Sequence, residues 1–94
     1  MRLAWTEAAV ADLRALEAFI PEDNPDAAGR QARTVVAAAQ NLIRFPETGR
    51  AGRRPGTREL VVPRTAYIVA YRVRGDRVEL LRVLHGRQRW PGLP

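Results

Sequence analysis

The sequence of 94 residues contains no cysteine, no lysine and a single histidine. Without cysteine, disulfide bonds and thiolate metal sites are excluded. One histidine is too few for the common histidine-based metal sites, so we expect no metal and no cofactor. No apolar run approaches the roughly 18 to 20 residues of a membrane span, and the N-terminus lacks the pattern of a signal peptide. These absences predict a cytoplasmic protein with no membrane contact.

Positive charge is abundant, and all of it comes from arginine. The 16 basic residues exceed the 10 acidic ones, which gives a net charge of +6 and an isoelectric point of about 11.4. Codon usage in a GC-rich genome is one explanation for the missing lysine, but it does not explain the excess over acids. That excess predicts an anionic partner, either nucleic acid or an acidic protein. The length predicts a single domain over residues 1–94.

The first half of the sequence predicts a short strand and two helices. Residues 2–5 alternate as a strand, and Thr6 is a suitable N-cap for a helix with Glu7 in its first turn. Pro21 ends that helix, and Asn24-Pro25-Asp26 supplies a cap, a first helical proline and an early acid for the second. Apolar residues recur with helical spacing in both segments: Ala9, Leu13, Leu16 and Ile20, then Ala28, Ala32, Val35, Val36, Ala39, Leu42 and Ile43. The short connection predicts an antiparallel helix hairpin.

The second half predicts a loop followed by a three-stranded antiparallel meander. Prolines and glycines mark residues 45–57 as the loop. Strands are expected at residues 59–62, 66–74 and 77–85, with Gly75-Asp76 as a two-residue hairpin turn. That turn sets the register, in which the facing pairs are Arg74 with Arg77, Arg72 with Glu79, Tyr71 with Leu80, and Tyr67 with Leu84. The predicted fold class is therefore α+β.

Both faces of the predicted β-hairpin are substantially apolar. Two helices cover only one face, so we expect the other face to be an exposed apolar surface that meets a partner. The expected helix contribution to the core is Leu13, Leu16, Val36, Leu42 and Ile43. These side chains pack against Val69, Tyr71 and Leu80, or against the opposite face of the same hairpin. Arg82 lies among apolar neighbours, where it either meets a carboxylate or a partner, or extends its head to water.

Two segments hold the candidate functional side chains. The loop carries Arg50, Arg53 and Arg54, and it is either a solvated connector or an arginine-rich edge that faces an anion. The segment VLHGRQRWPG, residues 83–92, follows the last strand. Its histidine, His85, is either structural or a general acid, and Trp90 either covers the end of the core or anchors a partner.

The order of elements and four sequence segments resemble the RelE/ParE toxin superfamily. The segments are LAWTEAAVADL, FPETGRAG, TRELVV and AYIVAYRVRGDRVELLRVLHGRQRWP, and the resemblance extends over nearly the whole chain. The resemblance implies the toxin of a type II toxin–antitoxin (plasmid stabilization) system, paired with an acidic antitoxin in a hetero-oligomer. It implies two activities on one fold. RelE-like members are ribosome-dependent mRNA endonucleases, whereas ParE-like members inhibit DNA gyrase.

The positions that carry catalytic cations in RelE distinguish the two branches. In this sequence they fall on Glu59, Val61 and Ile68, and on or next to Gln88, and no tyrosine follows Tyr71. Losing one electrostatic donor costs a factor of about 100 to 1,000 in rate. We therefore expect the ParE-like activity, with gyrase as target and no catalytic residues. The residues expected to contact the target or partner are Arg64, Arg82, Arg87, Arg89 and Trp90.

Two alternatives remain at the level of sequence. In a nuclease acting on ribosome-bound mRNA, Glu59 or Glu47 is the base and His85 the acid. The phosphate clamps in that reading are Arg64, Arg82 and Arg87. The second alternative is a degenerate, non-toxic member that binds only its antitoxin or DNA.

Overall fold

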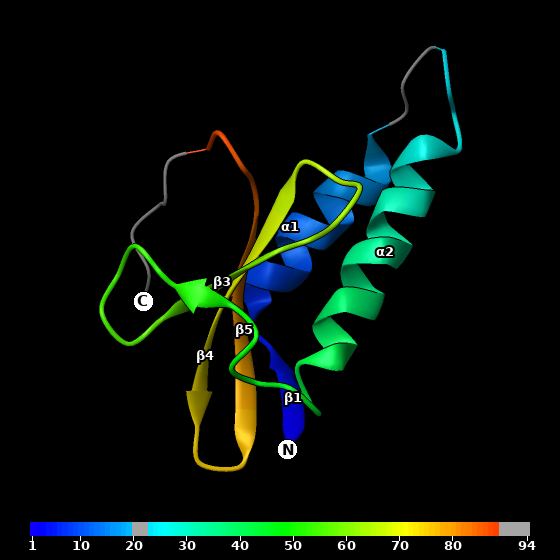
Figure 1. The fold of residues 1–94 in the computed structure, drawn as a ribbon. Coiled ribbons are helices and arrows are strands. Elements are labelled where there is room, and N and C mark those ends of the chain that lie inside the picture. Colours follow the sequence, from blue (N-terminus) through cyan, green and yellow to red (C-terminus); the bar gives the residue numbers. More distant parts are fainter. Residues whose placement is uncertain (20–22, 89–94) are drawn as a thin grey trace.

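Five strands and two helices make up the computed structural model, which describes residues 1–19 and 23–88 (Figure 1). The elements are β1 (Arg2–Trp5), α1 (Glu7–Ala18), α2 (Ala27–Asn41), β2 (Arg50–Ala51), β3 (Arg58–Val61), β4 (Tyr67–Arg74) and β5 (Arg77–His85). The strands form one sheet in the order β1-β5-β4-β3-β2. The α+β class, the N-terminal strand, the helix pair and the antiparallel meander are confirmed. The short strand β2 and the parallel pairing of β1 with β5 were not predicted.

The start of α1 is confirmed and the start of α2 is corrected. The Thr6 hydroxyl accepts a hydrogen bond from the backbone N–H of Ala9 at 3.2 Å, as an N-cap does. The N-cap position of the second helix is Asp26 rather than Asn24, Pro25 precedes the helix, and the Asp26 side chain makes no cap hydrogen bond. The Asn24 side chain accepts a hydrogen bond from Arg30 instead of from a helix amide. Ile20 and Pro21 lie outside the described residues.

The core lies between the two helices and one face of the sheet. Its buried members are Ala9, Val35, Ala39, Leu42, Val62, Val69, Tyr71, Val78, Leu80 and Val83. Leu16 is also buried, and Leu13 packs against this cluster. Val36 and Ile43, predicted as core, are only half-buried. The inward face is therefore the one that carries Val69, Tyr71 and Leu80.

A β-bulge in β5 changes the predicted register at one end of the hairpin. From the turn, which Gly75 makes with a φ of 57°, the pairs are as predicted up to Tyr71 with Leu80. Leu81 then has no partner, and Tyr67 faces His85 instead of Leu84. An extra residue exchanges the two faces of a strand beyond it. Counting from the turn by strict alternation places Leu84 on the inward face. Because of the bulge, Val83 lies there instead and belongs to the core.

The face of the sheet opposite the helices, here called the outer face, is not the exposed apolar surface that we predicted. Ile68, Ala70, Leu81 and Leu84 lie on it and are all buried. The segment between β2 and β3 folds back over this face, where the Arg53 guanidinium donates a hydrogen bond to the Gln88 carbonyl at 3.0 Å. That bond joins the loop to the end of β5 across the intervening strand.

Tyr71 connects the sheet to the loop before β2. Its hydroxyl donates to the Pro46 carbonyl at 2.7 Å and accepts the buried N–H of Gly49 at 2.8 Å. A Cβ on Gly49 would lie 2.6 Å from the tyrosine oxygen. This contact requires glycine at position 49.

Tyr71→Phe removes both hydrogen bonds and leaves a buried N–H without its acceptor, so we expect a loss of about 2 kcal/mol in unfolding free energy. Burial raises the pKa of the Tyr71 phenol above its ordinary value of 10.0. The unfolded state therefore ionises first, and wild-type stability falls as the pH rises above that value. Urea unfolding from pH 7 to pH 11 should show the difference between the two proteins shrinking at the alkaline end. A constant difference would contradict the assignment.

Candidate functional site

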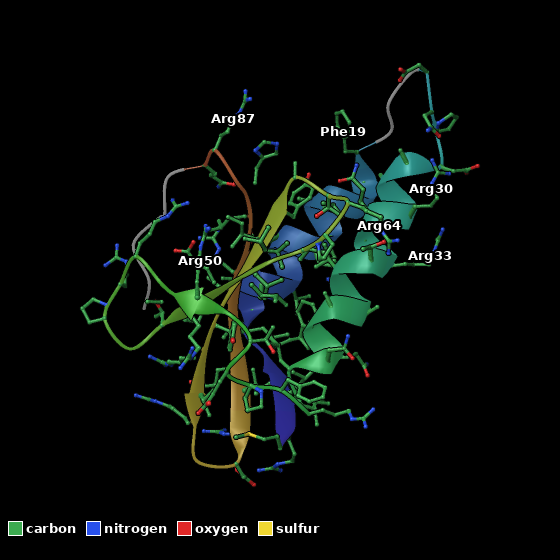
Figure 2. The ribbon with its side chains drawn as sticks, viewed as in Figure 1. Phe19, Arg30, Arg33, Arg50, Arg64 and Arg87 are labelled. Atoms are coloured by element: carbon green, nitrogen blue, oxygen red, sulfur yellow. The ribbon has the colours of Figure 1, made fainter. Side chains whose placement is uncertain are left out.

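Arg64 lies in the turn between β3 and β4, beside α2. Among the described residues, it is the only non-glycine with a positive φ, 64°, a conformation that costs about 1–2 kcal/mol. With Arg30, Thr34 and Thr65 it lines a hollow of about 360 Å³. Figure 2 shows Arg30, Arg33 and Arg64 on this side of the molecule. The Thr34 and Thr65 hydroxyls donate to backbone carbonyls within the fold. The guanidinium groups are therefore the donors here that suit an anionic group of a partner.

His85 and Arg87 lie at the end of β5. The His85 ring packs edge-on against Tyr67 with ring centroids 5.7 Å apart. Its Nδ1 accepts the backbone N–H of Arg87 at 3.3 Å, which leaves only Nε2 for a substrate. The Arg87 side chain is exposed and extends from the fold in Figure 2. Arg89 and Trp90, predicted to act with it, lie outside the described residues.

Arg82 is engaged within the fold, and its partner is Asp12 of α1. Its Nε and Nη2 donate to the two carboxylate oxygens at 2.7 and 2.8 Å. The hydrogen bond from Arg82 to Asp12 raises the pKa of the guanidinium above its ordinary value. The side chain is 18% exposed. Of the possibilities left open by the sequence, the carboxylate is the one observed.

The same carboxylate completes the edge of β5. β1 pairs with β5 only as far as Leu80. Beyond that point the Thr6 hydroxyl donates to the carbonyls of Leu80 and Leu81. The Asp12 carboxylate accepts the N–H of Val83 at 2.9 Å. Side chains at the start of α1 thus replace the missing strand partner, which sequence patterns of apolar residues do not reveal.

Glu59 is a structural carboxylate rather than an accessible base. It is 2% exposed, and it pairs with Arg50 at 3.1 Å and with Arg53 at 3.4 Å. It also accepts the backbone N–H of Arg53 at 3.0 Å. Two of the three loop arginines therefore hold the loop on β3.

Glu59 and His85, one of the two possible bases and the acid of the alternative nuclease reading, lie apart in the sheet. Glu59 faces Ala70 in the sheet, on the outer face. His85 faces Tyr67, on the side of the helices. Side chains on opposite faces of one sheet cannot act on a single phosphate.

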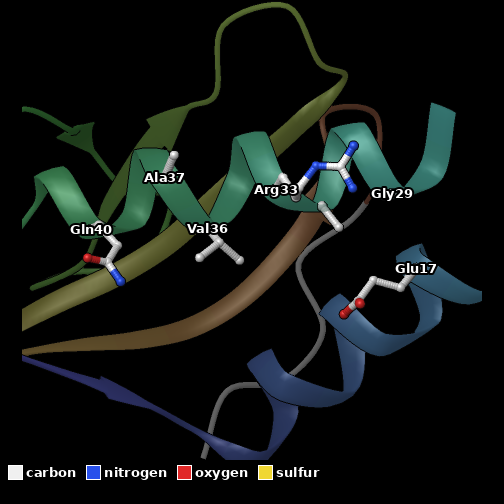
Figure 3. A pocket seen from close by; sticks show the side chains of 7 residues that line it. Glu17, Gly29, Arg33, Val36, Ala37 and Gln40 are labelled. Carbon is white, nitrogen blue, oxygen red and sulfur yellow. The ribbon is translucent and has the colours of Figure 1, made fainter. Parts of the chain in front are cut away.

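A groove lies on α2 where the helix faces Glu17 of α1 (Figure 3). It has a volume of about 540 Å³. Its lining is Glu17, Gly29, Ala32, Arg33, Val36, Ala37 and Gln40. The small side chains along α2 make its floor apolar, and Arg33 and Glu17 lie at its rim (Figure 3).

Neither helix in the described part combines the length and apolar character needed to cross a membrane. Within residues 1–19 and 23–88, no group of three or more histidine, aspartate or glutamate side chains is arranged to hold a metal ion.

Two solved structures share this arrangement. The chromosomal ParDE toxin–antitoxin system from P. aeruginosa contains a chain that aligns with a TM-score of 0.78 at 29% identity, covering 88% of this chain and 92% of that one. The toxin–antitoxin complex RelBE2 from Mycobacterium tuberculosis contains one with a TM-score of 0.65 at 29% identity, covering 89% and 95%. The fold class is that of the RelE/ParE-like toxins.

Sequence comparisons define the family. The family model described as "ParE toxin of type II toxin-antitoxin system, parDE" matches residues 3–90. Putative toxin Y4kP of Sinorhizobium fredii is 42% identical over 90 residues, 96% of this chain and 93% of its own. Toxin RelE2 of Caulobacter vibrioides is 34% identical over 84 residues, 89% and 93% respectively. The chain belongs to the ParE toxin family and is the toxin of a type II toxin–antitoxin system.

Proposed function

We propose that this toxin inhibits DNA gyrase, as a ParE-like toxin, and does not cleave mRNA. The observation that carries the proposal is the separation of Glu59 from His85, a base and the acid of the alternative nuclease. Glu59 is buried in ion pairs on the outer face, and His85 lies on the other face. Arg82, a candidate phosphate clamp, is neutralised by Asp12.

The local charge also favours gyrase inhibition. Cleavage of RNA requires cations beside the phosphate in the transition state. RelE carries such cations at positions on its strands. At two of these positions this chain has Val61, which is exposed, and Ile68, which is buried. A valine and a buried isoleucine supply no charge to a phosphorane-like transition state. Arg64 and Arg87, which lie elsewhere, are exposed and make no ion pair with a carboxylate of the described residues.

For the target contact we infer the hollow beside Arg64 together with Arg87 at the end of β5. A strained arginine backbone is retained where the side chain has a use. We therefore expect gyrase inhibition to be most sensitive to substitution of Arg64. Gyrase acts on the bacterial chromosome, so this proposal places the toxin in the cytoplasm.

For neutralisation we propose an acidic antitoxin that docks an amphipathic helix in the groove on α2. The two structural neighbours are toxin–antitoxin systems. The floor of the groove has Gly29, Ala32 and Ala37, which permit close approach of a helix, and Arg33 offers a cation at the rim. Apolar burial and opposite charge both favour such a complex.

The test compares supercoiling by gyrase with the integrity of ribosome-bound mRNA. We expect the purified toxin to inhibit supercoiling and to leave mRNA intact. His85→Ala should retain inhibition, whereas Arg64→Gln should weaken it by roughly tenfold, the typical loss for a charge-assisted contact. Arg14→Gln removes the same charge from α1 and serves as the matched control.

Cleavage of mRNA in the ribosomal A site, lost specifically in His85→Ala, would instead assign the nuclease activity. The relatives named RelE toxins make that assay necessary. A protein with neither activity that still binds its antitoxin would be a degenerate, non-toxic member.

A further inference from the structure

Arginines from three strands lie side by side on the outer face of the sheet, at the end that holds the β4–β5 turn. Arg2 of β1 faces Arg77 of β5, and Arg77 faces Arg74 of β4. The next residue of β4 on this face is Arg72, which faces Glu79. Alternation places these four arginines opposite the core residues of the same strands. We call Arg2, Arg72, Arg74 and Arg77 the arginine row.

The row carries more positive charge than its neighbours neutralise. Glu79 lies 2.6 Å from Arg72, 3.7 Å from Arg77 and 3.9 Å from Arg74. Asp76 lies 3.4 Å from Arg2. Four guanidinium groups therefore share two carboxylates.

Like charges directly opposite each other on neighbouring strands are destabilising. Arg74 lies opposite Arg77, and Arg77 lies opposite Arg2, and the two carboxylates offset only part of the resulting repulsion. The side chains of Arg74 and Arg2 are 61% and 72% exposed, so their heads are available to a ligand. The hydrogen bond from Arg72 and the nearby guanidinium groups lower the pKa of Glu79, so protonation does not change this balance near neutral pH.

The composition of the row favours phosphate over protein as ligand. A protein interface has an apolar core, often aromatic, whereas the residue of β1 that follows this face beside the arginines is the small Ala4, which faces Glu79. Single-stranded nucleic acid is bound by aromatic side chains that stack on its bases, and the row has none. The backbone of a duplex needs only cations with suitable donors, and the arginine fork matches phosphate oxygens. Strands lie about 4.8 Å apart, so three of them span roughly 10 Å.

We propose that the arginine row binds the phosphate backbone of double-stranded DNA. The choice of DNA over duplex RNA rests on the proposed function, because gyrase acts on duplex DNA. The binding itself is measured without gyrase. Failure of gyrase inhibition and failure of DNA binding are therefore separate results.

The test measures fluorescence anisotropy of a labelled mixed-sequence DNA duplex, with the full chain, over a series of salt concentrations. Arg74→Gln/Arg77→Gln is compared with Arg14→Gln/Arg44→Gln, which lowers the net charge equally, from +6 to +4, at positions on the helices' side. We expect the row variant to bind roughly tenfold more weakly, with a log–log salt slope shallower by about 1 per arginine. The helix-side variant should lose clearly less affinity for the duplex. The melting temperature of the row variant should be unchanged or higher, because like-charge pairs are removed.

If the double variant does not fold, Arg2→Gln at the exposed edge tests the same row with one charge. Equal losses of affinity in the row and helix-side variants would overturn the proposal. So would stronger binding of duplex RNA than of DNA, or displacement of the duplex by polyglutamate at equal charge concentration, which would point to an acidic protein. Unchanged DNA affinity combined with self-association of the row variant would instead assign the arginines to protection of the sheet edge.

Discussion

Val35→Asp is expected to abolish the cooperative thermal transition of this protein. Val35 is fully buried between α2 and the sheet, in a cluster of apolar side chains and Tyr71, whose hydroxyl already donates to the Pro46 carbonyl. An unpaired buried charge costs several kcal/mol, which is comparable with the whole stability of a small domain, about 5–15 kcal/mol. Circular dichroism on heating measures the result.

The neighbouring residue provides the matched control. Val36 is only half-buried and lines the groove on α2, so Val36→Asp should melt cooperatively. The same carboxylate on the floor of the groove should prevent capture by an acidic antitoxin, and toxicity should then persist when the antitoxin is co-expressed. A folded Val35→Asp protein would show that the helix phase is wrong. Normal neutralisation of Val36→Asp would show that the antitoxin docks elsewhere.

Asp12→Ala is expected to lower the unfolding free energy by about 3 kcal/mol. The substitution leaves Arg82 largely enclosed without its anion, and it leaves the N–H of Val83 without an acceptor. For a domain of this size, that loss corresponds to a fall in melting temperature of about 10–20 °C. Differential scanning calorimetry provides the measurement.

Removing both partners separates the ion pair from the edge of β5. In Asp12→Leu/Arg82→Met, no charge is left unpaired, so we expect part of the lost stability to return. The loss of unfolding free energy that remains in the double variant measures the cost of leaving the N–H of Val83 unpaired. If the double variant were as unstable as the sum of the single variants, the pair would not be coupled.

Local signals in the sequence predicted most of the elements. The Gly75-Asp76 turn and the alternation around it determine the register up to Leu80, because those pairs lie next to the turn. The cap at Thr6 depends only on residues within one helical turn. The helix periodicity assigned Leu16 and Leu42 to the core, where they lie, but of two neighbouring valines it assigned Val36, whereas Val35 is the buried one.

Features that depend on contacts between distant segments were not predictable in the same way. Alternation along a strand does not show where an extra residue is inserted. The bulge at Leu81 was therefore missed, and Val83 and Leu84 were assigned to the wrong faces. The partner of Arg82 is 70 positions away along the chain, at Asp12. For the candidate site, Arg64 and Arg87 were found exposed. The burial of Glu59 in ion pairs was not predictable, because nothing local shows that the loop arginines fold back onto it.

The interlocking of the first and last elements determines when this protein can fold during its synthesis. β5 lies between β1 and β4 in the sheet, and Thr6 and Asp12 bond to residues 70–75 positions further along the chain. Contacts of such separation require closure of a long loop before they contribute any stability. While the chain is still on the ribosome, β1 and α1 have no strand to pair with until residues 77–85 have left the exit tunnel. The sheet of this toxin is therefore completed only once β5 has been synthesised and has joined β1 and β4.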